Sequence, residues 1–167
     1  MQKWLAIATV IGSLTACGES SPTAPTSPAN IAGPYALTIT ASPACAANLP
    51  FPLLGFSATF TQNGSSVQVE LAAHAPGTPT GSVSGTVSGQ TVTFPSFPLS
   101  EAMGRGATLA GSASATVATG GMKITGTLSG TFQVPSGPSC SATSHQFELV
   151  RLCPQQTATG TVLAPCQ

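Results

Sequence analysis

Short segments in which apolar and polar residues alternate recur along most of this chain, separated by Gly, Pro, Asn and Ser. Alternation with a period of two is typical of β-strands that bury one face. No segment has the period of an amphipathic helix. The pattern predicts an all-β protein with about eight strands, at residues 35–42, 54–62, 66–73, 81–87, 90–97, 107–119, 122–134 and 145–152.

The connections between these segments indicate antiparallel pairing. Asn63 and Gly64 separate two predicted strands, and this dipeptide is the strongest short signal of a β-hairpin because both residues adopt positive φ at low cost. Each strand has one apolar face and one face of Thr and Ser, so the apolar faces must be buried against each other. We therefore expect a single antiparallel up-and-down β-barrel, with a two-layer β-sandwich as the alternative.

The N-terminus has the features of an export signal. Lys3 precedes an apolar run from Trp4 to Ala16, which is too short to cross a bilayer as a helix. The run ends in Leu14-Thr15-Ala16-Cys17, which resembles the lipobox of bacterial lipoproteins. The resemblance implies that residues 1–16 are removed and that Cys17 receives a diacylglycerol and an N-terminal acyl chain. An ordinary secretory signal followed by an unrelated cysteine is the alternative.

The resemblance also implies a location in the cell envelope. Gly18 follows the cysteine, whereas an Asp at that position is the inner-membrane retention signal of the family, so transfer to the outer membrane is expected. Residues 17–32 are rich in Ser, Pro, Thr and Ala and predict a flexible tether. Residues 33–167 then form the barrel domain. Its expected partner is the membrane, through the lipid on Cys17.

Four cysteines remain after Cys17, and disulfides are the default in an oxidising compartment. In an even-stranded barrel the last strand lies antiparallel to the first. Cys45 follows the first strand and Cys140 precedes the last, so we pair them, and we pair Cys153 with Cys166. The first bridge closes a loop of roughly 100 residues, which corresponds to about 4–5 kcal/mol in the chain-entropy model.

The same geometry places Tyr35, at the start of the first strand, beside Arg151, at the end of the last. Arg151 lies on the same face of the predicted strand as Phe147 and Leu149, which is the inward face. A guanidinium there needs a partner such as an aromatic ring. Gly33-Pro34-Tyr35 and Arg151 weakly resemble the calycin barrels, including lipocalins, in which an Arg of the last strand packs over the Trp of a Gly-x-Trp motif. Tyr replaces Trp here. The resemblance and the strand pattern predict a carrier of a small apolar ligand.

Charged residues make up only 5% of the chain, and the formal net charge is zero. Nucleic acid is therefore not an expected partner, because it requires a concentrated basic patch. No Cys-x-x-Cys spacing exists, so we expect no metal site and no cofactor. The residues able to act as acids or bases are few: Glu19, Glu70, Glu101, Glu148, His74 and His145.

Neither histidine forms a catalytic pair with a nearby carboxylate. Glu70 and His74 would be about 13 Å apart on a strand, and His145 and Glu148 would face opposite sides of one. We expect these residues to be solvated on the surface. The prediction is a non-catalytic envelope lipoprotein that binds a small apolar ligand. A structural or protein-interaction module is the alternative, and a hydrolase using distant His and Glu residues comes third.

Overall fold

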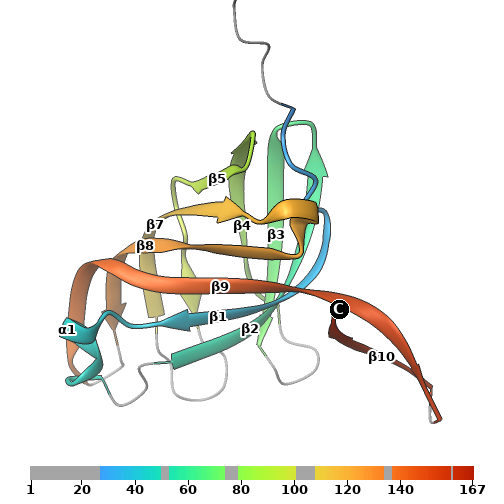
Figure 1. Ribbon diagram of the computed structural model, residues 1–167. Coiled ribbons are helices and arrows are strands. Elements are labelled where there is room, and N and C mark those ends of the chain that lie inside the picture. Colours follow the sequence, from blue (N-terminus) through green and yellow to red (C-terminus); the bar gives the residue numbers. More distant parts are fainter. Residues whose placement is uncertain (1–26, 50–52, 74–78, 101–107, 134–136, 159) are drawn as a thin grey trace, which may run out of the picture.

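The computed structural model describes residues 27–49, 53–73, 79–100, 108–133, 137–158 and 160–167. Eight antiparallel strands form a closed barrel, which confirms the predicted fold class (Figure 1). Successive strands pair along the chain, and β1 pairs with β9 to close the barrel. The strands are β1 (Gly33–Thr40), β2 (Leu53–Asn63), β3 (Ser66–Ala73), β4 (Pro79–Ser88), β5 (Thr91–Phe94), β6 (Leu99–Ser100), β7 (Thr108–Val117), β8 (Lys123–Gln133), β9 (Ser139–Thr157) and β10 (Gly160–Pro165).

The predicted strand at residues 90–97 is shorter in the structure, because β5 ends at Phe94. Pro95 and Pro98 follow, and proline has no N–H with which to continue a ladder. The chain then returns to the sheet as β6, so that β5 and β6 pair with successive parts of β7. Two short strands therefore occupy one position in the barrel wall.

Glycines on the inner face of the barrel allow neighbouring atoms to approach the strands closely. Gly85 lies between Val83 and Val87, which are both buried. A Cβ atom at Gly85 would lie 2.5 Å from Cδ1 of the Phe94 ring. Gly126 is similar, since a Cβ there would lie 2.6 Å from the Cβ of Ala115. Both glycines serve packing.

A β-bulge in β9 changes which of its residues face the interior. Leu128 of β8 pairs with His145, but Gly130 pairs with Ala142, so β9 contains one extra residue. Cys140 and Ala142 are partly buried before the bulge, whereas His145 is completely buried after it. The predicted last strand, 145–152, therefore begins too late, because β9 starts at Ser139.

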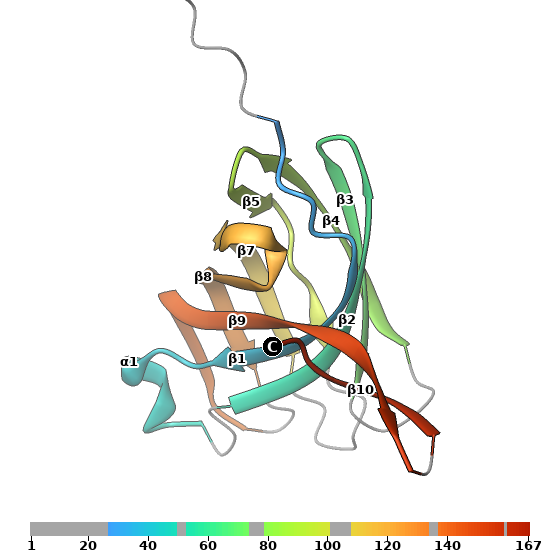
Figure 2. The same ribbon diagram turned by 45° about the vertical axis from the view of Figure 1, so that its right-hand side comes forward.

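Besides β6 and the short 3-10 helix at Thr119–Gly121, the described residues contain a helix and a strand that were not predicted. The helix α1 (Pro43–Ala46) has four residues, too few for a detectable helical period. The strand β10 pairs with the part of β9 that extends beyond the barrel, and together they form a projecting two-stranded ribbon (Figures 1 and 2). Pro154 and Pro165 lie within this ribbon, and proline normally argues against a strand.

The last residues of the tether predicted at 17–32 are not a free linker. Ile31 is completely buried in the barrel core. Ala29 N–H donates to the carbonyl oxygen of Gly89, and the amide of Gln62 bonds to both Ala29 and Ile31. Residues 29–31 are therefore attached to the barrel, because burial of one isoleucine and these hydrogen bonds compensate for the lost chain freedom.

Candidate functional site

The barrel interior is filled by aromatic side chains from five places in the chain. Neighbouring ring centroids in the row are 5.1 Å apart for Tyr35–Phe60, 6.4 Å for Phe60–Phe94, 5.5 Å for Phe94–Phe97 and 6.1 Å for Phe97–Phe147. These distances are in the range of favourable aromatic pairs. Each of the five side chains is at most 3% exposed. The row occupies the space in which a lipocalin-like carrier would hold its ligand.

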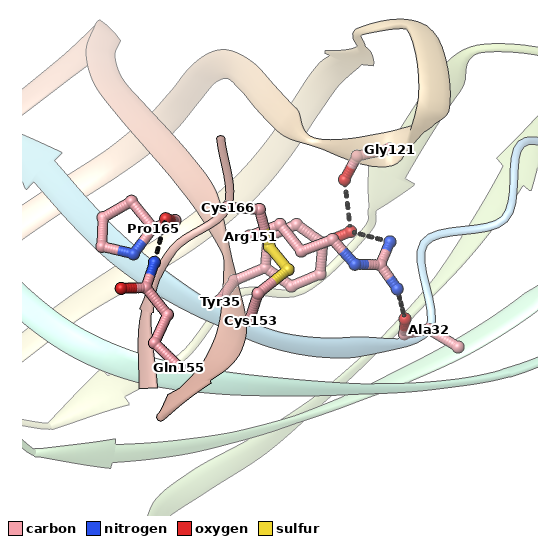
Figure 3. The surroundings of a disulfide bond; sticks show 8 residues. All are labelled: Ala32, Tyr35, Gly121, Arg151, Cys153, Gln155, Pro165 and Cys166. Carbon is pink, nitrogen blue, oxygen red and sulfur yellow. Dashed lines mark hydrogen bonds between the residues drawn. A yellow bond between two sulfur atoms is a disulfide. The ribbon is translucent and has the colours of Figure 1, made fainter. Parts of the chain in front are cut away.

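Tyr35 and Arg151 meet at one end of the barrel, where they face each other across the β1–β9 pair (Figure 3). The Tyr35 hydroxyl donates to the carbonyl oxygen of Gly121 at 2.7 Å and accepts a hydrogen bond from Arg151 Nη1 at 3.2 Å. Arg151 Nη2 donates to the Ala32 carbonyl, and the Arg151 Cζ atom lies 5.5 Å from the centre of the Tyr35 ring. This contact joins β1, β9 and the β7–β8 connection.

Burial dominates the electrostatics of this contact. It raises the pKa of the Tyr35 hydroxyl, and the nearby Arg151 charge and hydrogen bond only partly oppose that effect. The hydroxyl therefore stays protonated at physiological pH and can donate to Gly121. Since the Tyr35 hydroxyl and both terminal nitrogens of Arg151 bind to other groups of the protein, the contact serves closure of the barrel.

Both disulfides join the cysteines that the strand order predicted. Cys45 and Cys140 are bonded with a Cα–Cα distance of 5.6 Å, across 95 residues of sequence. This bridge connects α1 to the start of β9. Cys153 and Cys166 are bonded with a Cα–Cα distance of 5.1 Å, and they lie beside Tyr35 and Arg151 (Figure 3). The two bridges therefore lie near opposite ends of the part of β9 that pairs with β1.

His145 differs from the prediction of a solvated surface residue, because it is completely buried. Its side chain lies on the same face of β9 as the buried Phe147 and Leu149, so alternation along the strand already placed it inside. Ser42 N–H donates to His145 Nδ1 at 3.1 Å, and Nε2 lies 3.2 Å from the carbonyl oxygen of Gly130. Since a peptide nitrogen can only donate, the neutral tautomer with hydrogen on Nε2 satisfies both contacts. The Phe132 ring packs edge-on, with centroids 4.8 Å apart.

The surroundings of His145 favour its neutral form. Burial lowers its pKa, and the hydrogen bond to Gly130 opposes this only in part. The ring connects the end of β1 to β8, so its two nitrogens are used for structure. A second polar group here is Ser42, which is 2% exposed.

The remaining candidate acids and bases are not assembled into a site within the described residues. Glu148 faces away from His145 and forms an ion pair with Lys123 on the outer surface, with an N–O distance of 2.9 Å. Both side chains are about half exposed. Glu70 is exposed on β3. Cys17, Glu19, His74 and Glu101 lie outside the described residues. Across those that are described, no group of three His, Cys, Asp or Glu side chains could hold a metal ion.

A groove of about 580 Å³ lies on the outside of the barrel, where β4 separates from β5. Exposed Ser84, Thr86 and Thr93 line it together with Phe94 and Pro95, and Ser112 and Ala113 of β7 complete its wall. The hydroxyls of Thr86 and Thr93 are 2.9 Å apart at the last pair of the β4–β5 ladder. Its volume is in the range of small-molecule sites. Sequence reasoning missed this groove, because the break after Phe94 creates it.

No protein-family model matches this chain, and neither a curated protein nor a solved structure matches it. Within the described residues, no helix has the length and apolar character needed to cross a membrane.

Removal of the Tyr35 hydroxyl tests the closing contact. We expect Tyr35→Phe to lower the free energy of unfolding by about 1–3 kcal/mol, because the Gly121 carbonyl and the Arg151 guanidinium each lose a buried partner. Urea denaturation followed by fluorescence or circular dichroism measures the change. Thr38→Val, on the outer face of β1, is the control and should change the value by about 0.5 kcal/mol or less. Equal stability of Tyr35→Phe and wild type would contradict this role.

Acidification tests the role of His145. Because its pKa is lower in the folded state, its contribution to stability is complete above the unfolded value of about 6.5 and is lost as the pH falls through the folded value. We expect the unfolding free energy to decline as the pH falls below about 6.5, and His145→Phe to decline less over the same pH range. The variant should also be about 1–3 kcal/mol less stable at pH 7.5, because the Ser42 N–H loses its acceptor. An unchanged pH profile in the variant would show that another group titrates.

Proposed function

We propose that this chain is a lipid-anchored, non-catalytic protein of the bacterial cell envelope, whose barrel is a rigid module for interaction or support. The supporting observation is the use of the cysteines. The two disulfides account for four of the five cysteines in the sequence. The fifth is Cys17, and it follows Leu14-Thr15-Ala16 at the end of an apolar run.

The disulfides support export to an oxidising compartment. Bridges persist outside the cytosol, where thiols are not kept reduced. A lipid on Cys17 would attach the protein to a membrane, most simply the outer membrane because Gly18 follows the cysteine. Residues 18–28 would then connect the lipid to Ala29, which is bonded to the barrel.

The filled interior favours an interaction or support module over a carrier that holds its ligand inside the barrel. The aromatic row uses the central space for packing. The outer face carries mainly Thr and Ser side chains with few charges. Such a rigid domain acts through its outer surface.

A small apolar ligand remains a second candidate, at a different place. The outer groove between β4, β5 and β7 has the volume for one. Exposed Pro95 provides apolar contact, whereas Phe94 and Ala113 line the groove but are only 1% and 6% exposed. The ligand would lie against the outside of the barrel wall, with hydroxyls of Ser84, Thr86 and Thr93 at the rim.

Replacement of Cys17 tests the anchor. We expect mass spectrometry of the mature wild-type protein to find Cys17 as the first residue, carrying diacylglycerol and an acyl chain. The Cys17→Ser variant should move from the membrane fraction to the soluble fraction, because it offers no thiol for the lipid. Ser20→Ala, three residues later, is the matched control and should stay with the membrane. A mature protein that still begins at Met1 would refute the proposal.

A fluorescent apolar probe tests the second candidate. If the groove is a ligand site, residues 18–167 bind one probe per chain. Ser112→Trp, which places a large side chain in the groove, should weaken binding about tenfold. Thr127→Trp, on the outer face of β8, is the control and should bind as wild type does. Absence of stoichiometric binding would rule out the ligand site, and the role as an interaction or support module would be the remaining proposal.

A further inference from the structure

The β9–β10 ribbon is a rigid extension of the barrel. The pairing of β9 with β1 ends at Arg151, and from Leu152 onward its partner is β10. The Cys153–Cys166 disulfide locks the base of the ribbon, and Gln155 donates to the Pro165 carbonyl (Figure 3). Near the tip, Gln156 bonds to Thr161 at 2.9 Å. The ribbon therefore has a fixed shape, and Figures 1 and 2 both show it projecting away from the barrel.

The outer edge of β10 has backbone groups available for pairing. The strand order ends at β10, which pairs on one side alone within the described residues. Cys166 N–H donates to the Arg151 carbonyl, and bonded pairs alternate along an antiparallel ladder. The N–H and C=O groups of Thr161 and Leu163 therefore point away from β9. Pro154 lies opposite Leu163 and has no N–H to donate, which agrees with this assignment.

The same edge is apolar and uncharged. Val162 is 45% exposed and Leu163 is 57% exposed, although both are large hydrophobic residues. No charged residue follows Arg151 in the sequence. Natural proteins usually protect a free edge strand with a charge, which prevents pairing with another chain. Proline and short length also protect edge strands. The β10 edge has no charge, and its proline, Pro165, lies two residues beyond Leu163 and outside the segment 161–163.

We propose that β10 is a self-association edge, which pairs antiparallel with β10 of a second copy of this chain about a two-fold axis at Val162. Thr161 then lies opposite Leu163 of the other copy, and each such pair exchanges two hydrogen bonds. Every outward N–H of Thr161 and Leu163 is used. The two Leu163 side chains become diagonal neighbours on one face of the joined ribbon.

The chemistry of the edge favours a strand over a lipid surface as its occupant. A membrane would cover Leu163 but would leave the outward N–H and C=O groups without partners, at a cost of several kcal/mol each. A second copy satisfies both the apolar side chains and the backbone. Symmetric pairing brings no like charges together, because the segment has none.

Sedimentation velocity on residues 18–167, which contain the closed barrel and both disulfides, tests the proposal from about 10 µM to about 1 mM. A six-residue strand gives a small interface, so we expect a weak, concentration-dependent dimer. Leu163→Lys should weaken the dimer about tenfold or more, because two ammonium groups approach each other. Leu53→Lys is the matched control, since Leu53 is 60% exposed on β2, and it should dimerise as wild type does.

A second variant separates backbone pairing from apolar contact alone. Leu163→Pro keeps an apolar side chain but removes the outward N–H, while the ladder to β9 does not use that group. We expect it to weaken the dimer as Leu163→Lys does. Wild type that stays monomeric at about 1 mM, or a dimer that persists in Leu163→Lys, would overturn the proposal. So would Leu163-dependent binding of the monomer to phosphatidylethanolamine–phosphatidylglycerol vesicles, which would identify a membrane contact.

Discussion

Pairing of β1 with β9 is the interaction on which the rest of the structure depends, because it closes the sheet into a barrel. The contacting strands are more than 100 residues apart in sequence, so their pairing has a large cost in chain entropy. Additional contacts hold the two ends of the pair. Tyr35, Arg151 and Gly121 hold one end, and the Cys45–Cys140 bridge with the buried His145 holds the other. Closure also removes the edges of the sheet that would otherwise be open.

Closure in turn sets what the interior can contain. The chain has few large side chains, with seven Phe, one Tyr and one Trp. The row from Tyr35 to Phe147 fills the centre, and inward glycines such as Gly85 allow the rings to approach the wall. The result is a close-packed core, in which small changes in volume have a cost. The aromatic row therefore occupies central space that a ligand inside the barrel would need.

Much of this fold was predictable from alternation alone, because period-two segments with turn residues between them define antiparallel strands. The pairing of Cys45 with Cys140 and the proximity of Tyr35 and Arg151 followed from the strand order. Features that depend on local breaks in the pattern were not predictable. The bulge between Ala142 and His145 turns Cys140 and Ala142 toward the interior although their parity differs from that of His145, Phe147 and Leu149, and the prolines after Phe94 split one strand and open the outer groove. The lipid on Cys17 is still a prediction, since it rests on the sequence.

The ribbon formed by β9 and β10 differs from the barrel because it has a free edge and contributes little to the core. A chain that closes its sheet has no free edge, yet this chain adds β10 and so creates one. The added strand contributes little to the core, because Val162 and Leu163 remain exposed. A disulfide at its base nevertheless fixes its shape. A segment that is rigid, apolar and unnecessary for closure is best explained by what it contacts outside the barrel, and the barrel holds that contact at a defined place.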